Sequence, residues 1–216
     1  MGKVRGIDKA GVVTAALAVL DDGGIDAVTV RAVAAELGVK APALYHHVRN
    51  KQDLLDEMGT EIHRRVIATI AARDRAGTGW LDDLAAYAGA LREVYLAHRD
   101  GARTFSGTLI TDPAVLRAQE PWLRRWTEAG VTKTLAFDAV EMTTAFVVGF
   151  VIEEQERAQS ASHPARYDPD ARGERLGTDV PLVVEAGHAR ERSQPRFERQ
   201  LAVLLTGLET RAAAGS

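Results

Sequence analysis

The sequence contains no cysteine, so it can form no disulfide bond, thiolate metal site or cysteine nucleophile. It also lacks a long hydrophobic run. Its most apolar stretch, within residues 145–152, is far shorter than the roughly 20 residues that span a membrane. The first residues lack the apolar segment of a signal peptide. These absences favour a cytoplasmic protein with no membrane partner.

The common catalytic and metal-binding motifs are missing as well. None of the six histidines falls in an H-E-x-x-H pattern, and no G-x-S-x-G, P-loop or G-x-G-x-x-G motif is present. The acidic pairs Asp21-Asp22 and Asp82-Asp83 are adjacent in sequence, so their side chains point to different faces of a helix. The sequence therefore predicts no enzyme, no metal site and no cofactor.

An overall excess of positive charge is absent too, because the formal net charge is −3. Nucleic-acid binders are often basic, so this value counts mildly against DNA binding. The charge is uneven, however. Residues 1–51 carry seven lysines and arginines against five acidic residues, a local charge of +2 that leaves −5 for the rest. The basic end of the chain is its N-terminal part.

What the sequence does contain is helical periodicity. Apolar residues recur at the spacing of one helix face, and no convincing strand pattern interrupts them. We expect an all-α fold with a long helix over about 134–157. Residues 158–195, rich in Pro, Gly, Ser, Arg and Asp, predict a mobile loop with room for a helical turn. The expected domains are 1–50 and 51–216.

Two short helices joined by a turn at Gly38 are typical of a helix-turn-helix. In that motif the second helix, here from Ala41 to about His47, enters the major groove of DNA. Leu44 and Val48 should point inward. A three-helix core with surface charges is the alternative, because this spacing has many false matches. The candidate DNA-binding residues are Thr29, Arg31, Lys40, Ala41, Pro42, Ala43, Tyr45, His46, His47 and Lys51.

Lys51 and Arg31 have the clearest expected roles. Lys51 should begin a helix, where the helix dipole disfavours a cation, so we expect a protein without DNA to gain nothing from it. A DNA phosphate at that helix end would be bound by the lysine and by free N–H groups. Arg31 is long enough to reach a base edge, and arginine–guanine is the commonest specific pair.

The run from Ala43 to Leu55, LYHHVRNKQDLL within it, resembles the DNA-binding domain of the TetR (tetracycline repressor) family, as does the stretch from Thr29 to Val39. The resemblance implies a regulator that contacts DNA through a small set of side chains: Arg31, Lys40, Tyr45, His47 and Lys51. Many family members carry Ser or Thr near Lys40 and Ala43, where this chain has no hydroxyl.

The C-terminal part is similar to the tetracycline-repressor branch of the same family at residues 99–102, 149–156 and 197–209. In that branch these segments hold the ligand pocket and the dimer-forming helices, so the resemblance implies a ligand-binding and dimerisation domain. The residues themselves agree. A helix from Thr134 that is apolar on several sides would be covered in a four-helix bundle with a second copy. A large monomeric core is the alternative.

Phe105 stands where the resembled repressors have a histidine that binds drug-chelated magnesium, while Thr108 and Glu153 keep the family residues. A phenyl ring cannot ligate Mg²⁺, which takes oxygen ligands. We therefore expect an aromatic-lined cavity and a mainly apolar or aromatic inducer that needs no metal. Core packing is the alternative for each aromatic residue. The candidate ligand-binding residues are Tyr87, Leu91, Phe105, Thr108, Trp122, Trp126, Met142, Phe146 and Glu153.

Together these patterns predict a ligand-responsive transcriptional repressor. A homodimer would bind a double-stranded, pseudo-palindromic operator and be released by a small-molecule inducer. A DNA-binding regulator or architectural protein without small-molecule sensing is the alternative.

Overall fold

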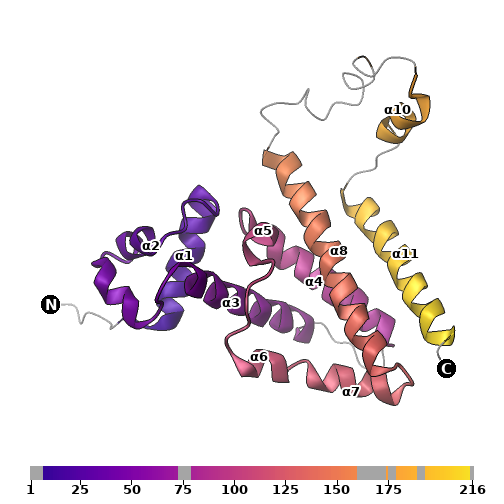
Figure 1. The fold of residues 1–216 in the computed structure, drawn as a ribbon, viewed down its shortest axis with the longest axis horizontal. Helices are drawn as coiled ribbons and strands as arrows, with labels where there is room; N and C mark the ends of the chain where they lie inside the picture. Colours follow the sequence, from indigo (N-terminus) through magenta and orange to yellow (C-terminus); the bar gives the residue numbers. More distant parts are fainter. Residues whose placement is uncertain (1–6, 73–78, 160–173, 175–178, 189–192, 215–216) are drawn as a thin grey trace.

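The computed structural model describes residues 7–72, 79–159, 174, 179–188 and 193–214. Every regular element within these residues is a helix, which confirms the expected all-α fold. The chain forms an N-terminal group of helices that is followed by a larger helical body (Figure 1).

The N-terminal group consists of α1 (Lys9–Gly23), α2 (Val30–Glu36), the 3₁₀ helix η1 (Ala41–His46) and the first part of α3 (Lys51–Ala71). Side-chain caps begin the α-helices: Thr29 accepts a hydrogen bond from the Ala32 N–H at 3.0 Å, and Asn50 accepts one from the Asp53 N–H at 2.9 Å. The turns after α1 and α2 use Gly24 and Gly38, whose φ angles of 75° and 66° favour glycine.

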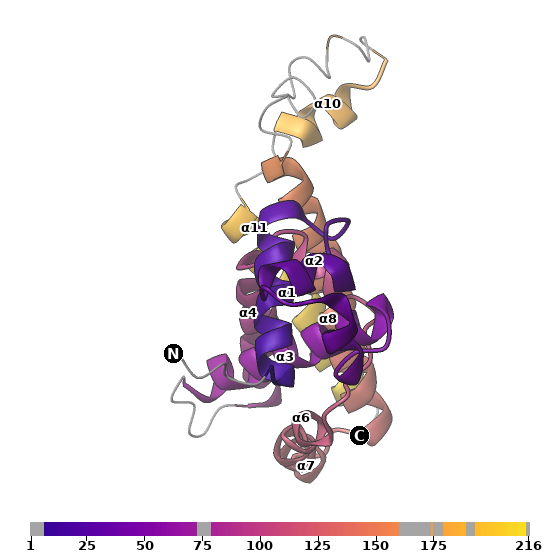
Figure 2. The same cartoon turned by 90° about the vertical axis from the view of Figure 1, so that its left-hand side faces the viewer.

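The body consists of α4 (Trp80–Leu96), α5 (Gly101–Phe105), α6 (Pro113–Arg117), α7 (Glu120–Glu128), α8 (Lys133–Gln159) and α11 (Ser193–Ala214). The predicted long helix is α8, and it extends slightly beyond its expected bounds at both ends. It packs against α4, α5, α7 and α11. Figure 2 shows the N-terminal helices stacked in front of this body.

One apolar core runs through both groups of helices. Leu54 and Met58 of α3 pack with the N-terminal helices, and Ile62 and Val66 of the same helix continue into the body, all with at most 1% of their surface exposed. The α3 helix is therefore the connector between the two predicted domains. A second cluster around Leu84 and Trp126 joins α4, α7, α8 and α11.

The predicted loop over residues 158–195 falls mainly on residues outside the described ranges. Within this range lies the helix α10 (Pro181–His188), where the sequence allowed for a helical turn. The predicted bounds are too wide at both ends, because α8 continues to Gln159 and α11 begins at Ser193.

Among the described helices, α8 has the length and apolar composition to cross a membrane, with 33% of its most apolar window buried in the single chain. A core helix of a soluble protein passes the same test. The packing of α8 on four other helices fits that interpretation.

Candidate DNA-binding surface and ligand cavity

The η1 helix presents a polar outer face next to α2. Leu44 and Val48 are buried as predicted, with 0% and 1% exposure, and they fasten η1 to the core. Because a 3₁₀ helix brings residues i and i+3 into line, Pro42 and Tyr45 lie along one ridge, with Ala43 and His46 on the next. Lys40, Pro42, Tyr45 and His46 are exposed, whereas Ala41, Ala43 and His47 are half-buried.

Arg31 and Thr29 lie at the start of α2. The Thr29 hydroxyl caps the helix, so its oxygen is engaged within the protein. Arg31, the second residue of α2, is exposed, and no hydrogen bond or ion pair holds its guanidinium among the described residues. This side chain has the freedom to contact a partner outside the chain.

Lys51 is exposed at the first position of α3, as predicted. The expectation that it gives the DNA-free protein nothing is wrong. Its Nζ donates a hydrogen bond to the carbonyl oxygen of Ile25 at 3.1 Å, which satisfies a main-chain acceptor between α1 and α2. Nearby, Arg49 Nε donates to Asp53 Oδ2 at 2.6 Å, and this bond lowers the pKa of the Asp53 carboxyl.

A cavity of about 30 Å³ lies inside the body, enclosed by α3, α4, α7 and α8 and by the residue before α7. This volume holds about one water molecule. Among the described residues, no aspartate, glutamate, lysine or arginine lines it. The lining residues are His63, Val66, Ile67, Tyr87, Gln119, Trp122, Leu123, Trp126 and Val140.

The polar groups around this cavity are few and mostly neutral. Burial lowers the pKa of His63, which favours the uncharged imidazole. The Tyr87 hydroxyl lies 2.9 Å from the Thr144 hydroxyl oxygen, and burial raises the pKa of Tyr87. Trp126 Nε1 already donates to Asp83 Oδ2 at 2.8 Å. The cavity is therefore an apolar, indole-lined space with His63 and Gln119 as its polar side chains that have no partner among the described residues.

Only three of the nine candidate ligand-binding residues line this cavity. Tyr87, Trp122 and Trp126 line the cavity. Phe105, 2% exposed, instead stacks on Tyr95 with ring centroids 6.2 Å apart, and Leu91 is fully buried in the core.

Four other candidates lie outside the cavity lining. Phe146 packs on Phe150 and Phe197. The remaining three have separate settings: Thr108 donates to the Phe105 carbonyl oxygen at 2.9 Å, Glu153 pairs with Arg157 and Arg196 at 3.3 Å, and Met142 is 49% exposed.

Sequence reasoning missed His63 and Gln119 as cavity residues. His63 lies one residue after Ile62 in the apolar stripe of α3, three residues before Val66. A polar side chain next to an apolar stripe is the signal that marks it. Gln119 lies between α6 and α7, where no helical pattern indicates its direction.

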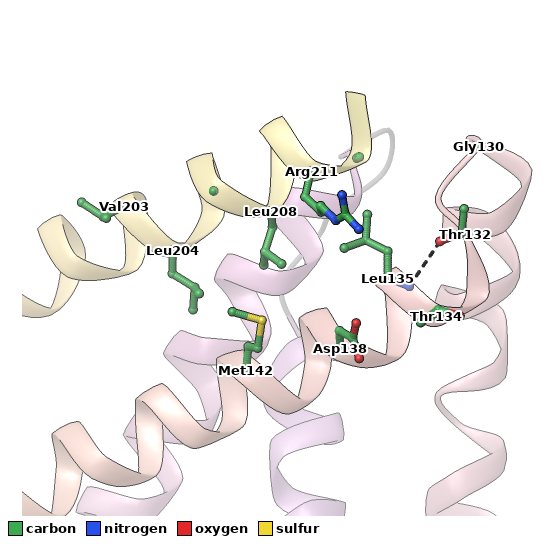
Figure 3. Close-up of a pocket in the computed structure, with 12 residues that line it drawn as sticks. Gly130, Thr132, Thr134, Leu135, Asp138, Met142, Val203, Leu204, Leu208 and Arg211 are labelled. Atoms are coloured by element: carbon green, nitrogen blue, oxygen red, sulfur yellow. Dashed lines mark hydrogen bonds between the residues drawn. The ribbon is translucent and has the colours of Figure 1, made fainter. Parts of the chain in front are cut away.

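A separate groove of about 660 Å³ runs between α8 and α11 on the outer face of the body (Figure 3). Leu204 and Leu208 of α11 and Met142 of α8 point into it, and Asp138 and Arg211 lie toward one end. The two helices also expose Phe137 and Val203, with 63% and 72% of their surface accessible. This part of the single chain carries an uncovered apolar surface.

A helix-turn-helix with a polar ridge, joined by one helix to an all-helical body, is the architecture of a DNA-binding regulator. Residues 12–58 match the family model for bacterial regulatory proteins of the tetR family. Residues 74–212 match the model for the tetracyclin repressor-like C-terminal domain. The chain belongs to the TetR family, which is a family of transcriptional regulators.

The relatives agree with this assignment. The chain is 37% identical over 211 residues to the tetracycline repressor protein class A from transposon 1721 of Escherichia coli, covering 93% of this chain and 89% of that protein. It superposes with a TM-score of 0.77 and 31% identity on a possible TetR family transcriptional regulator from Streptomyces coelicolor A3(2), covering 94% and 99% of the two chains. TetR (class A), solved with 5a,6-anhydrotetracycline and magnesium, matches with a TM-score of 0.68 and 31% identity over 92% and 96%.

Proposed function

We propose that this chain is a ligand-responsive transcriptional repressor of the cytoplasm. It binds a pseudo-palindromic DNA operator as a homodimer and is released by a small, mainly apolar or aromatic molecule. The observation that carries the proposal is the uncharged, indole-lined cavity directly behind α3, the helix that also begins at the DNA-binding surface. A ligand in this cavity contacts the helix that holds the DNA-binding head.

On the DNA side, the candidate side chains have several different roles. Lys51, Tyr45 and His47 contact phosphates, which position the head without reading sequence. Arg31 reads a base edge, and Lys40 adds positive charge before η1. Thr29 acts indirectly, because its hydroxyl caps α2. Ala41, Pro42, Ala43 and His46 form the surface of η1 that enters the groove.

The homodimer forms through α8 and α11. A second copy would cover the exposed Phe137, Met142 and Val203 and bury the groove between the two helices. Gly149 supports this face as the interface. A Cβ atom there would meet nothing within 4 Å among the described residues, so no contact in one chain requires the glycine. Close approach of a helix from a second copy would require a residue without a side chain at this position.

The inducer is a neutral molecule with an aromatic ring system. Two indoles and Tyr87 supply ring faces, and each well-placed aromatic pair adds about 0.5–1.5 kcal/mol beyond area burial. A charged ligand would lose water and meet no counter-charge among the lining residues that the structure describes. The cavity is far smaller than the roughly 300–1,000 Å³ of a ligand pocket, so the inducer binds an opened state. By favouring that state over the DNA-competent one, it releases the operator.

The inducer binds without a metal. The described lining residues offer an imidazole and an amide but no carboxylate, whereas Mg²⁺ takes mainly carboxylate and water oxygens. This differs from the relative solved with 5a,6-anhydrotetracycline and magnesium. Phe105, at the position of the family's metal-binding histidine, is packed on Tyr95 and has no ligating atom.

The test is release of an operator duplex that the protein itself selects from a random pool. Neutral polycyclic aromatic compounds should release it equally with and without EDTA. Release only by anhydrotetracycline with magnesium, abolished by EDTA, would overturn the metal-free inducer. Operator binding that no compound in the panel reverses would favour the alternative of a regulator without sensing.

A further inference from the structure

His98 lies where the DNA-binding head meets the body, in the turn between α4 and α5, with 7% of its surface exposed. Its Nδ1 is 3.0 Å from both carboxylate oxygens of Asp21, near the C-terminal end of α1. Its Nε2 is 3.1 Å from Arg65 Nη1 on α3. The edge of the ring packs against Phe105 of α5, with centroids 6.2 Å apart. One imidazole therefore contacts the head, the connecting helix and the body.

The partners of His98 fix its protonation state. An arginine guanidinium can only donate hydrogen bonds, so Nε2 must accept from Arg65. Nδ1 then carries the hydrogen and donates it to Asp21. Arg65 is held in place by Glu61, which accepts from its Nε at 3.1 Å. The geometry requires a neutral ring, because a second N–H at Nε2 would oppose the guanidinium.

Main-chain contacts surround this side-chain link. Asp21 Oδ1 also accepts from the Arg99 N–H at 3.2 Å, and Arg99 Nη1 donates to the Asp22 carbonyl oxygen at 2.8 Å. From α8, Gln155 Nε2 donates to the His98 carbonyl oxygen at 2.7 Å. The turn that carries His98 is thus attached both to the end of α1 and to the long helix of the body.

We propose that His98 is a positioning residue for operator binding. By joining Asp21 of the head to Arg65 of the connecting helix, the neutral imidazole fixes the angle at which the head leaves the body. That angle decides whether the two heads of a dimer match the spacing of two half-sites. His98 is not among the described residues that line the cavity. The inference rests on the proposed function, since it concerns how the same repressor holds its heads.

Three substitutions separate the two halves of the link. His98→Phe keeps the ring and removes both hydrogen bonds. His98→Asn places an amide N–H near the position of Nδ1, which retains the bond to Asp21. His98→Gln reaches the position of Nε2, which retains the bond to Arg65. Binding is measured on the self-selected operator duplex and on a duplex with one half-site, which a single head engages.

We expect His98→Phe to weaken binding to the full operator about tenfold or more, which corresponds to at least ~1.4 kcal/mol. Binding to the half-site duplex should stay within about twofold, because one head needs no partner spacing. The affinities of His98→Asn and His98→Gln for the full operator should lie between those of His98→Phe and the unmodified protein. Asp21→Ala combined with His98→Phe should bind no worse than the weaker single variant, since both remove one link.

Equal losses of affinity for both duplexes would show that His98 only stabilises the DNA-binding head. Unchanged affinity for both duplexes would show that His98 does not position the head. Either result overturns the proposal. If His98→Phe does not fold, the Asn and Gln variants supply the same comparison. The proposed function fails separately, when the unmodified protein does not distinguish its selected operator from random DNA.

Discussion

Lys51 Nζ donates a hydrogen bond to the carbonyl oxygen of Ile25, 3.1 Å away, and this bond ties the first residue of α3 to the loop between α1 and α2. The lysine is exposed, so it remains accessible to a phosphate at the same helix end. A single substitution of Lys51 would therefore remove this bond together with the proposed phosphate contact.

Lys51→Ala should weaken binding to operator and random DNA alike. The slope of log affinity against log salt should shrink by roughly one per lysine lost, because one phosphate contact disappears. The lost bond to Ile25 should also lower the free energy of unfolding by about 0.5–1.5 kcal/mol. Lys133→Ala, at the first residue of α8, is the matched control. An unchanged salt slope would remove Lys51 from the DNA interface.

Arg31→Ala should relax sequence discrimination. If the guanidinium makes a bidentate contact to a base, the loss on the correct operator is about 1–3 kcal/mol, with little loss on random DNA. Competition binding with operators altered one base pair at a time measures this. Losses of the same size on every sequence would make Arg31 a backbone contact instead.

Val203→Arg should produce monomers without disturbing the fold of one chain. The side chain is 72% exposed in the single chain, so a charge there is costly only when a second copy covers it. Leu204→Arg and Leu205→Arg should give monomers or insoluble protein, because these residues also pack on the core. Leu182→Arg on α10 is an equally exposed control. Sedimentation of the unmodified protein as a stable folded monomer would contradict the dimer.

The stability of the folded chain should decrease in mild acid, partly through His63. Burial lowers the pKa of His63 in the folded state, so the unfolded chain binds the proton first as the pH drops below about 6.5. Unfolding is then favoured. Urea denaturation at pH 7.5 and 5.5 should show a smaller loss of stability in His63→Leu than in the unmodified protein. Identical losses would assign the acid sensitivity to other groups.

The fold was largely predictable because its signals are local. Apolar residues at helical spacing, Thr29 and Asn50 as caps, and Gly24 and Gly38 in left-handed turns each specify an element from a few neighbouring residues. The η1 helix differed from expectation only in its 3₁₀ geometry. The buried positions of Leu44 and Val48 followed from the same spacing.

The cavity was harder to predict because it depends on how helices far apart in the sequence meet. Phe105 and Trp126 are both aromatic and both 2% exposed, yet only Trp126 lines the cavity. No local pattern distinguishes them. The bond from Lys51 to Ile25 also joins residues 26 positions apart, so a charge at a helix start gave no indication of it.

The turn between α4 and α5 leaves almost no room for change. Asp100 has a φ of 54°, a Cβ atom on Gly24 would lie 2.6 Å from Asp100 Oδ2, and one on Gly101 would lie 2.2 Å from the Tyr95 carbonyl oxygen. In a library of random substitutions selected for repression, these three positions should therefore tolerate few replacements. In such a library, the turn between α4 and α5 and its contact with Gly24 should be as intolerant of substitution as the proposed DNA-binding residues.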